Sequence, residues 1–155
     1  MKKITLICVG SLKEPYLKAA FDEYKKRISK FFDFQVIEIN EAKLQKNNST
    51  EIKRVIDLEG ENLAKKVNSG QVFPLCIEGE QMSSVEFAQL VDKSSDMGEV
   101  VFVIGGSYGL SDKIKQLGKK VSFGKLTYPH QLMRIMFLEQ LYRAGTILNN
   151  VEYHK

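Results

Sequence analysis

The fold of this chain is decided by one stretch of its sequence, VVFVIGGSYG at Val100–Gly109. The first five residues are all apolar, which is typical of a strand buried on both faces of a parallel sheet. The closely spaced glycines that follow allow a tight turn and let a ligand approach the main chain. Because ligands of parallel α/β sheets bind at the carboxyl ends of the strands, we expect a binding site at Gly105. A plain turn is the alternative, since G-G-x-x-G is not the GxGxxG spacing of dinucleotide-binding folds.

Strand and helix patterns alternate on both sides of this stretch. Apolar and β-branched runs predict further strands at Lys3–Val9, Phe34–Ile39, Val72–Ile77 and Val121–Phe123. Helical spacing and start signals predict five helices. The first begins at Pro15, and the second runs from a cap at Ser49 or Thr50 to about Asn68. The third covers Val85–Ser95 after a capping box at Ser83 and Glu86, a short one follows Ser111, and the last runs from Thr127 to about Leu148. The alternation predicts one α/β domain over residues 1–155, with a mostly parallel sheet and helices on both faces.

The composition fits a folded cytoplasmic protein. Apolar residues make up 43% of the 155 residues, which is enough for a packed core. The N-terminal apolar run is too short for a signal peptide and no run could span a membrane, so we expect a soluble protein. Cys8 and Cys76 both lie in apolar runs, which predicts two buried strand positions and no disulfide. Only two histidines are present, without metal-ligand spacing, so we expect no metal site.

The charge balance is mildly basic. Lys and Arg exceed Asp and Glu by 23 to 19, which suits an anionic partner but is also ordinary for a soluble protein. Several of these cations follow the glycine turn and predict a basic surface around it, although each alone is more simply a solvated charge. They are Lys113, Lys115, Lys119, Lys120, Lys125 and Arg134.

The last predicted helix has apolar residues on nearly every side. They include Leu132, Met136, Leu141 and Ile147. A helix that is apolar all round must be covered on more than one side. In a domain this small, another copy of the chain can supply the second cover, so we expect a homodimer through this helix.

Two segments near the C-terminus combine groups suited to chemistry. The loop Phe123–His130 enters the last helix, and we expect its backbone to line the same site as Gly105, with His130 in a structural role. The tail Tyr153–Lys155 combines an aromatic ring, an imidazole and a cation, which suit base stacking, proton transfer and phosphate contact. Arg143 lies four residues after Glu139, a spacing that also fits a simple salt bridge.

Taken in order, these motifs resemble the ribosomal RNA large-subunit methyltransferase H family, which belongs to the SPOUT class. The resemblance covers essentially the whole chain. The chain departs from the family pattern at Lys125, where a small residue is expected, and at Tyr108, where Asn or Glu is expected. The matching residues are Val9-Gly10, Lys53–Glu61, Ile104–Leu110, Leu126–His130, Arg134, Glu139, Tyr142–Ala144 and Tyr153–Lys155.

The resemblance implies an architecture and a cofactor. The α/β domain would carry a C-terminal trefoil knot, and the protein would be a homodimer with each active site at the interface. The cofactor would be S-adenosyl-L-methionine, held largely through backbone atoms. The residues implied to hold it are Leu75, Gly105, Phe123, Gly124, Lys125, Leu126, Thr127 and Tyr128.

The resemblance also implies a reaction, the methylation of N3 of pseudouridine 1915 in helix 69 of 23S rRNA on assembled ribosomes. N3 carries a proton that must leave, so a base that works near neutral pH is needed, and the imidazole of His154 is the candidate. Tyr153 would stack on or orient the base, and Arg143 would stabilise developing negative charge or hold a phosphate. Two alternatives stay open: an enzyme that uses another nucleotide at the Gly105–Gly106 turn, and a non-enzymatic ribosome-associated factor.

Overall fold

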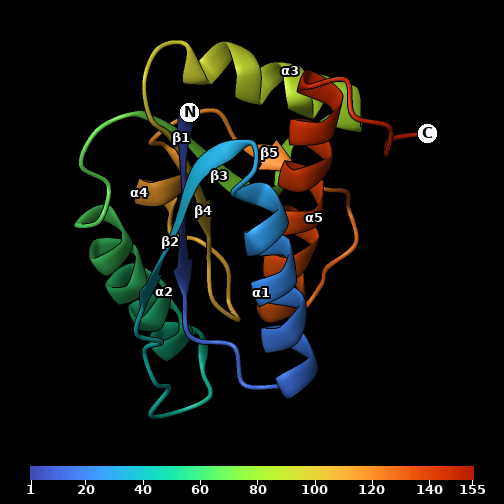
Figure 1. The fold of residues 1–155 in the computed structure, drawn as a ribbon. Coiled ribbons are helices and arrows are strands. Elements are labelled where there is room, and N and C mark those ends of the chain that lie inside the picture. Colours follow the sequence, from blue (N-terminus) through green and yellow to red (C-terminus); the bar gives the residue numbers. More distant parts are fainter.

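The computed structural model describes all residues from Met1 to Lys155, and helices alternate with the strands of a single parallel sheet (Figure 1). Five parallel strands lie in the order β2-β1-β4-β3-β5. The strands are β1 (Lys2–Val9), β2 (Phe32–Ile39), β3 (Gln71–Gln81), β4 (Val100–Ile104) and β5 (Val121–Ser122). The helices are α1 (Pro15–Ile28), α2 (Ser49–Ala64), α3 (Ser84–Ser95), α4 (Asp112–Lys115) and α5 (His130–Leu148). The predicted fold class is confirmed, while the trefoil knot stays a prediction.

The central strand β4 is buried on both faces, as its five apolar residues predict. Val100, Phe102 and Ile104 pack in a core with α1, α3 and α5. Val101 and Val103 point the other way, into a smaller core with α2 and α4. Because side chains of a strand alternate between its faces, this pattern places the helices in two layers, one on each side of the sheet.

Start signals in the sequence locate most of the helices. Pro15 begins α1, and Ser83 and Glu86 form the predicted capping box of α3. The predicted cap of α2 is wrong: Asn48 caps the helix by accepting a hydrogen bond from the backbone N–H of Glu51 at 2.8 Å. An Asn side chain satisfies that free N–H as well as Ser or Thr would, so composition alone does not choose among neighbouring candidates.

Helix α5 lies in the same layer as α1 and α3 and packs against both (Figure 1). Much of its apolar surface is therefore covered within the chain. Leu132 stays 39% exposed on its outer side, close to Tyr128 at 37% and Leu126 at 72% in the preceding loop. No helix of the protein combines the length and the apolar character that crossing a membrane requires.

Candidate functional site

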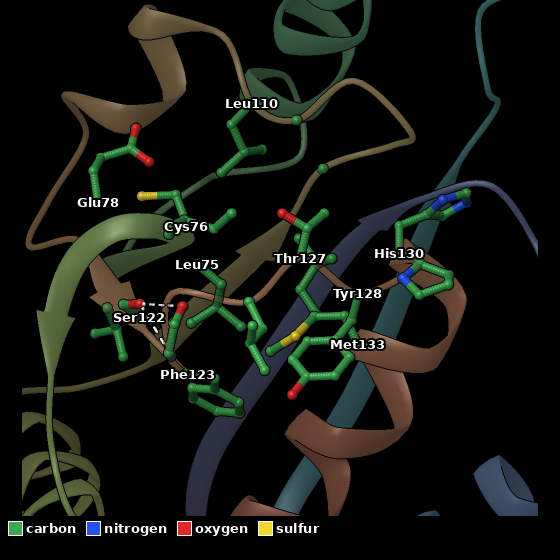
Figure 2. A pocket seen from close by; sticks show the side chains of 18 of the residues that line it. Leu75, Cys76, Glu78, Leu110, Ser122, Phe123, Thr127, Tyr128, His130 and Met133 are labelled. Carbon is green, nitrogen blue, oxygen red and sulfur yellow. Dashed lines mark hydrogen bonds between the residues drawn. The ribbon is translucent and has the colours of Figure 1, made fainter.

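A cavity of about 690 Å³ opens beyond the carboxyl end of β4, between β3, β5 and the first turn of α5 (Figure 2). Leu75, Leu110, Phe123 and Met133 supply apolar wall. Main-chain groups of the glycine turn and of the loop before α5 form much of the remaining cavity wall. A cavity of this size with apolar walls and a few polar groups is typical of a cofactor site.

The glycine turn forms the wall after β4. Gly106 and Gly109 form an isolated antiparallel bridge, and Gly109 has a positive φ of 88°. A Cβ atom added at Gly105 would lie 2.7 Å from the backbone of Gly109. Only glycine fits at Gly105, and the turn presents its main chain to the cavity.

The loop before α5 forms the opposite wall. The hydroxyl of Ser122 donates to the carbonyl of Gly124 at 3.1 Å and accepts from the N–H of the same residue at 3.2 Å. This tight turn holds Gly124 at φ 122°, a conformation that side chains rarely adopt. Every predicted cofactor residue lines the cavity except Lys125, which is exposed on the outside of the loop: Leu75, Gly105, Phe123, Gly124, Leu126, Thr127 and Tyr128.

Sequence reasoning missed the wall formed by the middle of β3. Leu75 and Glu80 both pair with Val121, so the residues between them bulge out of the ladder towards the cavity. Cys76 lies in this bulge and is only partly buried, which corrects the prediction of a fully buried strand position. Cys8 is buried as predicted. No signal in a single sequence reveals such a bulge, because it depends on the pairing of β5.

Ionisable groups lie at the two ends of the cavity (Figure 2). At one end Glu78 pairs with Lys115, and the hydrogen bond from Lys115 lowers the pKa of Glu78. Burial raises the pKa of the neighbouring Cys76 thiol. At the other end burial lowers the pKa of His130, whose Nε2 has no hydrogen-bond partner. The cavity therefore combines an apolar middle with polar ends.

The predicted catalytic residues lie together at the far part of α5. Arg143 pairs with Glu139 at 2.9 Å, and its guanidinium lies 4.7 Å from the ring centre of Tyr153. The hydroxyl of Tyr153 donates to Glu139 at 2.8 Å, a bond that raises the pKa of Tyr153 to about 12. His154 is exposed, with Nδ1 3.2 Å from a guanidinium nitrogen of Arg143. The tail is thus folded back on the helix rather than frayed.

This tail cluster, formed by Glu139, Arg143, Tyr153 and His154, contributes no wall to the cavity of the same chain. Met133 is the last α5 residue in the cavity wall, ten positions before Arg143. At 1.5 Å per residue the two are separated by roughly 15 Å along the helix. One chain alone does not bring the predicted cofactor residues and the predicted catalytic residues together.

The predicted basic surface is present only in part, because Arg134 does not belong to it. The side chain of Arg134 is 1% exposed and pairs with Glu38 at 2.5 Å. Its guanidinium also donates to the backbone carbonyls of Val9 and Gly10. Carboxylates of Glu61, Glu78 and Glu80 pair with three of the other cations, Lys113, Lys115 and Lys119. Lys120 and Lys125 are exposed and form no ion pair.

A buried carboxyl supports the glycine turn from behind. Glu59 of α2 is 2% exposed and accepts a hydrogen bond from the N–H of Ala42 at 3.0 Å. Its other oxygen has no partner and would be 2.9 Å from a Cβ added at Gly106. Burial raises the pKa of Glu59. Its spacing of four from Val55 and from Leu63, both buried, is the sequence signal that places it on the inner face of α2.

Comparisons with known proteins show the family of the chain. A family model described as predicted SPOUT methyltransferase matches residues 1–154. The chain is 46% identical to ribosomal RNA large subunit methyltransferase H of Caldicellulosiruptor saccharolyticus, over 98% of this chain and 99% of that protein. It is 43% identical to the protein of the same name from Streptococcus uberis, with 99% of each covered. Among solved structures, Archaeoglobus fulgidus Nep1 bound to S-adenosylhomocysteine aligns with a TM-score of 0.44 and 13% identity, over 93% of this chain and 99% of that one.

Proposed function

The chain belongs to the SPOUT methyltransferase family, and from this premise we propose that it transfers a methyl group from S-adenosylmethionine to large-subunit ribosomal RNA. The observation that carries the proposal is the cavity between the glycine turn and the loop before α5. The residues that the resemblance assigns to the cofactor come from three separate segments of the chain and, apart from Lys125, meet there.

The cavity fits S-adenosylmethionine in size and chemistry. Leu75, Leu110 and Phe123 offer apolar surface to a purine ring, and Gly105 and Gly124 keep main-chain groups free of side chains. The polar ends, with the Glu78–Lys115 pair and His130, suit the hydroxyl and amino-acid groups of the molecule. When bound, the cofactor supplies a methyl group already activated on a sulfonium, so the chain has to provide position and a deprotonated acceptor.

We propose N3 of a pseudouridine in helix 69 of 23S rRNA, within the assembled ribosome, as the acceptor. An imide nitrogen has to lose its proton, and the imidazole of His154 is the group of the tail cluster that can accept it as a general base. Tyr153 stays protonated because its pKa is raised to about 12, so it orients the base rather than removing a proton. Arg143 holds its charge and stabilises the anionic base.

The contact between His154 and Arg143 fixes the imidazole tautomer. A guanidinium nitrogen only donates hydrogen bonds, so Nδ1 of His154 accepts from it and the proton of the neutral ring is on Nε2. The lone pair that a general base needs is therefore engaged by Arg143. His154 has to turn away from Arg143 before it takes the proton of the acceptor, which leaves the guanidinium of Arg143 free to stabilise the anionic base.

We propose that the active site is shared between two copies of the chain, packed antiparallel through α5. A two-fold axis across this helix brings the tail of one copy to the first turn of α5 in the other, where the cavity lies. Leu126, Tyr128 and Leu132 are exposed at that end and give the partner apolar surface to cover. The partner subunit's His154 then acts on the base at this chain's cavity. Ribosomes are its substrate, so we place the protein in the cytoplasm.

The test is transfer of labelled methyl from S-adenosylmethionine to ribosomes from a strain that lacks the protein. We expect label in 23S rRNA, located by mass spectrometry to N3 of the helix 69 pseudouridine. Calorimetry with S-adenosylmethionine, NAD and ATP should give binding of the first alone. Absence of transfer with intact ribosome binding would favour a non-enzymatic factor, and preference for NAD or ATP would favour another nucleotide enzyme.

Complementation tests the shared site. Thr127→Trp fills the cavity, in the middle of which Thr127 lies (Figure 2), and removal of Tyr153–Lys155 deletes the tail. Each variant alone should be inactive. Mixing them should recover about a quarter of the wild-type activity, because half of the dimers are mixed and each mixed dimer has one intact site. A site formed within one chain would recover nothing.

A further inference from the structure

A second cavity of about 800 Å³ lies beside the first along the same edge of the sheet. It is formed by the segments that follow β1 and β2, Gly10–Lys13 and Asn40–Leu44, together with Ser107 and Tyr108 of the glycine turn. The carboxyl ends of these strands lie at the lower end of the sheet in Figure 1. Ser107 lines both cavities, so a ligand that occupies one lies next to a ligand in the other.

The wall between the two cavities is polar. The hydroxyl of Ser107 donates to Glu41 at 3.3 Å and lies 3.5 Å from Nδ1 of His130. Glu41 and Ser107 line the second cavity, and His130 lines the first. Unlike the apolar middle of the cofactor cavity, this region offers hydrogen-bonding groups, which are suited to a polar ligand.

The charged side chains of the second cavity that have no ion-pair partner leave it with a net positive charge. Lys13 and Lys43 are exposed and form no ion pair. Of the two carboxylates in the wall, Glu38 is neutralised by the buried Arg134, which leaves Glu41 as the single uncompensated acid. Two free ammonium groups on opposite segments suit phosphate groups, and Glu41 suits an amino group of a base.

Tyr108 adds an aromatic ring to the wall of the second cavity. It is 43% exposed, large and flat, and it lines the second cavity from the tip of the glycine turn. The bridge between Gly106 and Gly109 fixes the backbone on both sides of it. A rigidly mounted exposed aromatic ring next to unpaired cations is a combination that binds single-stranded nucleic acid by stacking and phosphate contact.

We propose that this second cavity binds a nucleotide next to the methylated base in the RNA, with Tyr108 stacked on its base and Lys13 and Lys43 on its phosphates. The inference rests on the proposed function, because the RNA it names is that substrate. The shared Ser107 sets the geometry: the target base reaches the methyl donor in the first cavity while its neighbour occupies the second. By binding two successive nucleotides, the protein distinguishes its target site from other RNA sites that carry the same target base.

Equilibrium binding of the full-length protein to ribosomes tests the inference, with the methyl-transfer assay run beside it. Tyr108→Ala should weaken ribosome binding about tenfold, the order of one stacked base. Tyr108→Phe keeps the ring and should bind as the wild type does. Lys13→Ala with Lys43→Ala should lower the slope of log affinity against log salt by about 1.4, since each phosphate contact on a single strand contributes about 0.7. Lys46→Ala, on the same loop but outside the cavity, is the matched control and should leave the slope unchanged.

Cofactor affinity should be wild type in all these variants, because none of the altered residues lines the first cavity. Ribosome affinity and salt slope unchanged in both Tyr108→Ala and the double lysine variant would overturn the inference. A wild-type protein that binds ribosomes but transfers no methyl group would instead overturn the proposed function. The two failures therefore appear in different measurements.

Discussion

Replacing Arg134 by methionine removes the buried guanidinium and keeps an unbranched apolar stem. The wild-type side chain is 1% exposed and its Nε has no partner. It donates to Glu38 at 2.5 Å and to the carbonyl of Gly10 at 3.0 Å, with a longer bond of 3.3 Å to Val9. The substitution thus removes three charge-assisted hydrogen bonds, which destabilises the folded state. It also removes a buried charge, which stabilises the folded state.

The expected loss of stability depends on how exposed Arg134 and its hydrogen-bond partners are. A hydrogen bond to a charged group contributes about 1.5 to 3 kcal/mol, and removing one partner of a fully buried pair costs about 3 to 5 kcal/mol. Glu38 is 45% exposed and recovers water when Arg134 is lost, so its part of that cost is small. Desolvation of the guanidinium is relieved at the same time. We expect a net loss of about 2 kcal/mol, which for a chain of this size lowers Tm by roughly 4 to 8 °C.

Thermal and urea unfolding, followed by circular dichroism, measure this difference. Glu38→Gln is the matched control, since it keeps an acceptor oxygen at a half-exposed position and should cost less than about 1 kcal/mol. An Arg134→Met variant as stable as the wild type would refute the reasoning. It would mean that the contacts of Arg134 only balance the desolvation of its charge.

Three further outcomes follow from the site. Gly124→Ala forces a side chain into φ 122°, at a strain of about 1 to 3 kcal/mol, so calorimetry should show S-adenosylmethionine affinity reduced about fivefold or more, and an unchanged Kd would contradict it. Burial raises the pKa of Glu59, so the folded state keeps its proton when the unfolded state loses it, and stability falls as pH rises above the ordinary value of 4.5. Glu59→Gln should therefore gain Tm relative to the wild type as the pH rises above 4.5, and a difference that does not vary with pH would contradict this. Because the pKa of Tyr153 is raised to about 12, the methylation rate of Tyr153→Phe should show the same pH profile up to pH 10 as the wild type, and an alkaline limb lost in the variant would contradict it.

The fold could be predicted because its decisive signals are local. Five apolar residues before a glycine turn indicate a strand covered on both faces, and β4 has that position at the centre of the sheet. Pro15 and the Ser83–Glu86 capping box mark helix starts through groups only a few residues apart. The extension of β3 to Gln81 was missed because the polar residues from Glu78 onwards are a strand only through their pairing with β5.

The candidate site was predicted in part. The glycines after β4 indicate a tight turn and a binding site at Gly105, whereas Gly124 was named only through the family resemblance. The burial of Arg134 was not predictable, because it depends on carbonyl groups at the end of β1 that are more than a hundred residues away in sequence. Cys76 was misplaced because a bulge between two pairings of Val121 turns it towards the cavity.

The strand order has a consequence for synthesis of the chain. β1 pairs on one side with β2, but its other neighbour is β4, which begins at Val100. At about 5 to 20 residues per second, a nascent chain keeps that edge of β1 open for several seconds after β2 is made. The cofactor cavity is complete only once Met133 has been added. S-adenosylmethionine, which we propose binds there, therefore stabilises only a chain that has reached Met133, and a nascent chain arrested before Val100 exposes an apolar strand edge that no ligand protects.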